Sequence, residues 1–100
     1  MEGNAMIEIK QDGNKLLCTF KGFMDTSNSG RVEPQLRQAL DGYKGSIVFD
    51  LQEVDYVASA FIRLCVAAHR AAGAEGFTIV NSKPPVKKVF MISGLQGMLG

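Results

Sequence analysis

The chain has 100 residues, of which 46% are hydrophobic and 21% charged, a composition that fits one folded domain over residues 1–100 and excludes a disordered or collagen-like chain. Eleven basic and ten acidic residues give a net charge of +1, so neither nucleic acid nor direct membrane binding is expected. No apolar run is long enough to span a bilayer and the N-terminus has no signal-peptide pattern, so we expect a cytoplasmic protein.

Two segments at the start of the chain alternate apolar and polar residues, as half-buried strands do. They run from Met6 to Gln11 and from Lys15 to Lys21, and the sequence Asp12-Gly13-Asn14 between them is typical of a hairpin turn. We therefore expect a pair of antiparallel strands.

A helix is predicted next from apolar residues at helical spacing, namely Val32, Leu36, Ala39, Leu40 and Tyr43. Because proline is tolerated near the first turn of a helix and not in its interior, Pro34 predicts a start between Gly30 and Val32. Gly42 is a plausible C-terminal cap, which predicts an end at Leu40 or Asp41.

The second half of the chain repeats the pattern of strand and helix. Ser46 to Leu51 is apolar and β-branched with little alternation, which is typical of a central strand covered on both faces. The helix that follows has an apolar side formed by Phe61, Leu64, Cys65, Ala68 and Ala72. Phe77 to Val80 predicts another strand, and Ser82-Lys-Pro-Pro starts a third helix that ends at Gly94.

This order of elements, ββαβαβα, predicts an α/β fold: a mixed sheet of about four strands with about three helices packed mainly on one face. The residues expected in its core include Val48, Leu64, Ala68, Val80, Val89 and Phe90.

Ser59 is the main candidate for a functional residue, because it lies where a predicted buried strand ends and a predicted amphipathic helix begins. A serine in this position can accept a hydrogen bond from an unpaired amide of the first helical turn. The positive end of the helix dipole also favours a phosphate placed there. Ser59 is therefore predicted to cap the helix, to be modified, or both.

Three motifs in the chain resemble those of STAS domains, the family of bacterial anti-sigma factor antagonists. Ala58-Ser59-Ala60-Phe61 stands where the family usually has Asp-Ser-Ser-Gly between a hydrophobic strand and a helix. Gly22-Phe-Met-Asp25-Thr-Ser is similar to the family's Gly-Glu-Leu-Asp segment, and Val80 to Leu95 is similar to its C-terminal signature ending in Ser-Gly-Leu. The resemblance extends from Met6 to Leu99.

The resemblance implies a regulatory protein that binds an anti-sigma factor, which is also a switch serine kinase, and that is released when this kinase phosphorylates Ser59. A serine phosphatase is then expected as a second partner. Partner-binding residues implied at and beside the tetrad are Asp25, Ala58, Ser59, Ala60, Phe61, Ile62 and Val66. The chain departs from the family pattern at Ala58, Ala60 and Phe61, which leaves Ser59 as the only hydroxyl acceptor in the tetrad.

Each of these residues also has a purely structural interpretation. Ser59 can be an N-cap alone, and Asp25 can cap the first helix instead of orienting a hydroxyl or a phosphate. Phe61 either points outward with Ile62 and Val66 as an apolar docking face or belongs to the core, as its spacing favours.

Other chemistry is not indicated. There is no GxGxxG, P-loop or nucleophile and base pair, so we expect neither an enzyme nor a cofactor, and His69 has no ligand partner for a metal. Cys18 and Cys65 are predicted to be buried reduced thiols, and Lys83, Lys87 and Lys88 a solvated face. Two alternative functions remain: a STAS subunit of a bacterial ABC transporter of lipids, which binds its ATPase without a phosphorylation cycle, and a nucleotide-binding module around Asp25 and Ser59.

Overall fold

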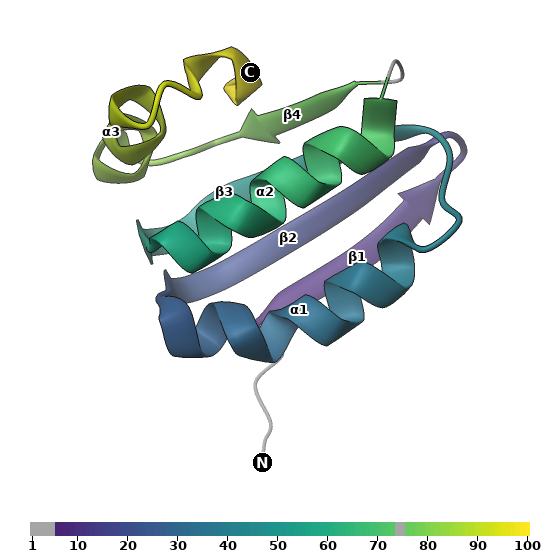
Figure 1. The fold of residues 1–100 in the computed structure, drawn as a ribbon, viewed down its shortest axis with the longest axis horizontal. Coiled ribbons are helices and arrows are strands. Elements are labelled where there is room, and N and C mark those ends of the chain that lie inside the picture. The colour runs from purple at the N-terminus through teal and green to yellow at the C-terminus, as the bar shows by residue number, and fades with distance from the viewer. Residues whose placement is uncertain (1–5, 74–75) are drawn as a thin grey trace.

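The helices of this protein pack against a four-stranded sheet (Figure 1). The computed structural model describes residues 6–73 and 76–100. The strands lie in the order β1-β2-β3-β4, with β1 and β2 antiparallel and the other two pairs parallel. The elements are β1 (Ile7–Asp12), β2 (Lys15–Met24), α1 (Thr26–Leu40), β3 (Ser46–Val57), α2 (Ser59–Ala72), β4 (Phe77–Val80), α3 (Pro84–Ile92) and the 3₁₀ helix η2 (Gln96–Met98). The predicted α/β fold with a mixed sheet is confirmed.

Helices α1 and α2 lie side by side across one face of the sheet, and α3 lies by the β4 edge (Figure 1). Side chains from this face and from the helices form one core. At its centre the ring centroid of Phe20 lies 4.8 Å from that of Phe49 and 4.9 Å from that of Phe61. Leu64, Ala68 and Phe90 are buried as predicted; the largest fully buried side chains are Phe20, Phe49, Phe61, Phe90, Met24 and Leu36.

The expectation that β3 is covered on both faces is wrong. Ile47 and Phe49 are buried, but Val48 between them is only half-buried, as is Val80 on β4. Because successive side chains of a strand point to opposite faces, Val48 lies on the face away from α1 and α2. Val89, also expected in the core, is half-buried against it.

The predicted start of α1 is also wrong, since the helix begins at Thr26 and contains Pro34 in its interior. Asp25 caps it, with the backbone amide of Asn28 donating to Asp25 Oδ1 at 2.8 Å. Pro34 has no amide hydrogen for the carbonyl of Gly30, but Gly30 is exposed, so water can take that place. The predicted end at Leu40 is confirmed.

Candidate functional site

The carboxyl ends of β2 and β3 bring the amino ends of α1 and α2 together at one edge of the sheet (Figure 1). Met24 pairs with Val57 at the end of the parallel ladder, and the amide of Ala58 donates to the carbonyl of Met24 at 2.9 Å. Asp25 follows Met24 directly, and Ser59 comes two residues after Val57. The sheet register therefore places the first turns of both helices next to each other.

Ser59 is the first residue of α2 and not its N-cap, so the capping prediction is wrong. The N-cap is Ala58, whose carbonyl accepts from the amides of Phe61 and Ile62 at 2.9 and 3.1 Å and whose side chain cannot cap. β3 ends at Val57 and Ala58 is the last residue with extended backbone, so helical backbone begins at Ser59 itself. Within the described part of the chain, the exposed Ser59 hydroxyl makes no hydrogen bond.

The site at Ser59 suits an added anion. The amino-terminal amides of an α-helix lack intrahelical acceptors, and the helix dipole is positive at this end. The carbonyl of Ala58 takes the amides of Phe61 and Ile62, but Ala58 has no side-chain oxygen to compete for the amides of Ser59 and Ala60. A phosphate on the exposed Ser59 would thus meet unpaired donors and solvent without displacing a side chain.

Asp25 has a defined structural role as the cap of α1. Asn28 stabilises the same turn with a second hydrogen bond, in which its side-chain amide donates to the carbonyl of Phe23 at 2.9 Å. Ser29 is buried one turn into the helix, and its hydroxyl donates to the carbonyl of Met24 at 3.3 Å. The loop before α1 is therefore fixed by its own polar residues.

Phe61 belongs to the core, as its spacing favoured, so the alternative in which it points outward and binds the partner directly is wrong. The side chain is fully buried and its ring meets that of Phe20 edge-on. Its spacing from Leu64 and Cys65, three and four residues later, places all three on the buried side of α2. Ala60, Ile62 and Val66 are half-buried and remain on the accessible part of the helix.

Phe23 and Tyr56 form an exposed aromatic pair that the sequence analysis missed. They are 57% and 48% exposed, and their ring centroids lie 6.3 Å apart. The two residues pair across β2 and β3, one position before Met24 and Val57. Strict alternation from the buried Cys18 and Phe20 would have placed Phe23 on the open side, which is the signal that could have revealed it.

Other candidate groups have ordinary structural roles. Lys83 forms an ion pair with Asp55 on the surface. His69 is exposed, and its ring lies edge-on to Phe77. Among the described residues no group of three or more histidine, cysteine or acidic side chains could hold a metal ion.

Both thiols are buried, as predicted, and burial suppresses their ionisation. Desolvation raises the pKa of the Cys18 thiol from 9.0 to about 12. The same effect raises the pKa of Cys65 strongly, although a backbone hydrogen bond opposes it. Neither residue is a nucleophile at neutral pH. No helix in the described part of the chain is long and apolar enough to cross a membrane.

Comparison with known proteins gives the class of the domain. Residues 7–100 match the family model described as "Mlab, STAS domain". The chain therefore belongs to the STAS domain family. BtrV of Bordetella bronchiseptica, whose name gives it the role of an anti-sigma factor antagonist, is 31% identical over 87 residues, which cover 85% of this chain and 74% of BtrV.

Solved structures of low sequence identity share the fold. SpoIIAA of Bacillus, an anti-sigma factor antagonist, is 17% identical over 94% of this chain; its unphosphorylated form gives a TM-score of 0.81 over 85% of that chain, and its phosphorylated form 0.73 over 88%. A STAS domain protein from Planctomyces limnophilus is 16% identical, with a TM-score of 0.83 over 97% of this chain and 88% of that one. The order of strands and helices predicted from the sequence is thus the order found in this family.

Proposed function

We propose that this protein is an anti-sigma factor antagonist that binds an anti-sigma factor of the switch serine kinase type, and that phosphorylation of Ser59 ends this binding. The observation that carries the proposal is the exposed Ser59 hydroxyl at the first position of α2, with no hydrogen bond to another described residue. The 31% identity to BtrV and the shared fold with SpoIIAA, known in both phosphorylation states, support it.

The docking surface in this proposal surrounds Ser59. It consists of Phe23 and Tyr56 at the strand ends and of Asp25, Ala58, Ser59, Ala60, Ile62 and Val66 at the two helix ends. Phe61 stands beneath this surface and holds the first turn of α2 against the core. Exposed aromatic side chains are common anchors of protein interfaces, so Phe23 and Tyr56 are the residues expected to contribute most to binding.

Phosphorylation acts on this surface through charge and hydration. A phosphate adds about 1.5 to 2 negative charges at neutral pH. It would lie beside apolar side chains that must lose water when the partner binds, so the complex would have to desolvate a dianion next to them. A serine phosphatase would restore the binding form.

The test is to measure, by calorimetry, the affinity of the anti-sigma-type serine kinase of the same organism for three proteins: wild type, Ser59→Ala and Ser59→Asp. The alanine variant should bind like wild type, and the aspartate variant about tenfold or more weakly. Incubation with the kinase and ATP should place one phosphate on Ser59, detected by mass spectrometry. Equal affinities together with an unmodified Ser59 would contradict the proposal.

A second candidate is a subunit of an ABC transporter that binds its ATPase without a phosphorylation cycle. It is favoured by one observation: Ala58, Ala60 and the fully buried Phe61 stand where the usual antagonist tetrad has an acid, a second serine and a glycine. Tight binding of a transporter ATPase that is unaffected by Ser59→Asp would favour this candidate over the first.

A further inference from the structure

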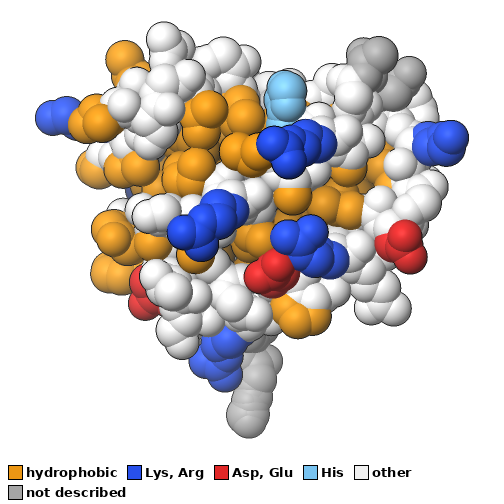
Figure 2. Space-filling model, in the orientation of Figure 1, with side chains coloured by type: hydrophobic (Ala, Val, Ile, Leu, Met, Phe, Trp, Pro, Cys, Tyr) orange, Lys and Arg blue, Asp and Glu red, His pale blue; other side chains and the backbone are white. Residues whose placement is uncertain are grey.

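A groove runs between α1 and α2 on the face of the molecule shown in Figure 2, where blue arginine and lysine side chains alternate with orange apolar surface. Its central part is a hollow of about 480 Å³. The lining residues, which we call the arginine groove, are Arg37, Ile62, Arg63, Val66, Ala67 and Arg70. They combine three cations with three apolar side chains and include no acid.

The groove continues in both directions along the two helices. Beyond Ala67 it opens into a second hollow of about 500 Å³, which reaches Asp41 and Ala71. In the other direction a third hollow of about 320 Å³ is lined by Glu33, the ion-pair partner of Arg37, and reaches Ala60, next to Ser59. The groove therefore begins at the proposed docking surface and follows the length of α2.

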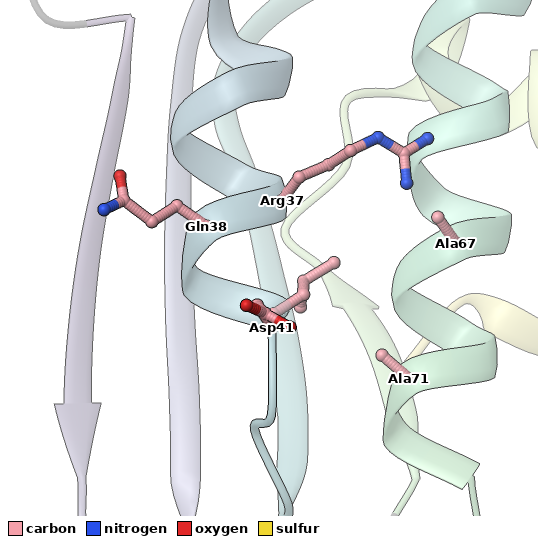
Figure 3. Close-up of a pocket in the computed structure, with 6 residues that line it drawn as sticks. Arg37, Gln38, Asp41, Ala67 and Ala71 are labelled. Carbon is pink, nitrogen blue, oxygen red and sulfur yellow. The ribbon is translucent and has the colours of Figure 1, made fainter.

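The arginines are placed to act on a ligand in the groove. Arg37 extends from α1 toward α2 and lies near Ala67, whereas Gln38 points away from α2 (Figure 3). The Nε atom of Arg37 donates to Glu33 at 2.6 Å, which fixes the side chain while its terminal amino groups remain available. Within residues 6–73 and 76–100, Arg63 and Arg70 form no ion pair.

We propose that the arginine groove binds an acidic amphipathic α-helix of the partner protein. The floor between the arginines is formed by half-buried Ile62, Val66 and Ala67, which calls for an apolar stripe on the ligand. The guanidinium groups around that floor match carboxylates, which they bind in a two-pronged geometry. A helix with leucines on one side and glutamates beside them presents both features at once.

The shape of the groove agrees with this occupant. Two packed helices leave a groove between their ridges, and a third helix fills it at an interaxial distance of about 8–10 Å. Nucleic acid would match the arginines but offers no apolar stripe for the floor. The net charge of +1 also gives the whole chain no long-range attraction for a polyanion.

This inference rests on the proposed function only in naming the helix as part of the partner; the groove is tested without that partner. The probe is a peptide of about 18 residues, or five helical turns, with leucines on one side and glutamates on the other. A second peptide has lysine in place of each glutamate. Amide resonances of the ¹⁵N-labelled chain are followed as each peptide is added.

The acidic peptide should shift the resonances of Val66, Ala67 and Ala71, and the lysine peptide should not. Arg63→Glu with Arg70→Glu should weaken the acidic peptide about tenfold or more, since two attractive pairs become repulsive. The matched control is Arg31→Glu with Lys87→Glu, which makes the same charge change at two exposed residues outside the groove and should alter affinity less than about twofold.

Three results would overturn the inference: no binding of the acidic peptide, an equal loss in the control variant, or shifts confined to residues outside the groove. The inference would also be overturned if phosphatidylglycerol vesicles or a single-stranded oligonucleotide bound more tightly than the acidic peptide and shifted the same resonances. Because Ser59 is unchanged in these variants, a failure here leaves the switch at Ser59 to its own test.

Discussion

Truncating Phe61 to alanine tests whether this residue supports the core or the partner surface. Its fully buried ring meets Phe20 edge-on with centroids 4.9 Å apart and lies 6.1 Å from Phe49. Truncation removes both aromatic contacts and leaves a cavity in the centre of the core. The free energy of unfolding should therefore fall by about 3–5 kcal/mol, a large part of the roughly 5–15 kcal/mol that stabilises a small domain.

Urea unfolding followed by circular dichroism measures this loss. Phe61→Leu retains much of the volume and should cost roughly 1–2 kcal/mol, which keeps the test usable if the alanine variant does not fold. Ile62→Ala, at the adjacent half-buried position, is the control and should cost less than Phe61→Ala. A loss below about 1 kcal/mol for Phe61→Ala, comparable to that of an exposed position, would refute the core assignment.

Three further predictions concern the helix caps, the aromatic pair and the buried thiols. Asp25→Ala should lower the free energy of unfolding by about 1 kcal/mol, whereas Ser59→Ala should change it by less than about 0.5 kcal/mol because Ser59 is not a cap; urea unfolding of both variants compares them, and equal losses would contradict the assignment. Phe23→Asp or Tyr56→Asp should weaken partner binding about tenfold or more with an unchanged circular dichroism spectrum, and an unchanged affinity in calorimetry would place the docking surface elsewhere. Burial raises the pKa of the Cys18 thiol from 9.0 to about 12, so the stability that the neutral thiol contributes is complete below pH 9 and is lost as the pH rises above 9. The free energy of unfolding, measured against pH, should therefore fall less steeply above pH 9 in Cys18→Ala than in wild type. Identical slopes would argue against the burial effect.

The fold was largely predictable because local patterns and the global architecture agree. Gly13 takes a φ of +60° in the two-residue loop that joins Asp12 to Lys15, as the hairpin prediction requires. The buried side of α2 and the bounds of β4 follow the spacing of their apolar residues. Where apolar residues recur at the spacing of a helix or of a strand, the sequence alone specifies which side of that element is buried.

The errors arose where one local rule competed with tertiary structure. Pro34 argued for a late start of α1, but the cap at Asp25 and the burial of Ser29 stabilise the four to six residues before the predicted start. The length of β3 could not be predicted because its second half has two register shifts, which bury Leu51, Val54 and Val57 at intervals of three.

The N-cap of α2 lies one residue earlier than the sequence suggested. Ala58 keeps extended backbone and serves as the cap, whereas Ser59 is already helical. The arginine groove was not predictable either, since Arg37 and Arg70 come from helices whose relative placement only the folded chain defines. The sequence thus revealed candidate residues that lie near one motif, such as Ser59, but not the arginine groove, whose residues only the packing of two helices brings together.

Binding of an anti-sigma-type serine kinase to wild type, Ser59→Ala and Ser59→Asp is the measurement that tests the central claim most directly. With Ala58 as the cap, none of the three side chains is needed to hold the helix start, so differences in affinity report on the docking surface and not on folding. The account predicts that wild type and Ser59→Ala bind alike and that Ser59→Asp binds about tenfold or more weakly. Equal affinity of all three variants, with no phosphate on Ser59 after incubation with the kinase and ATP, would contradict it.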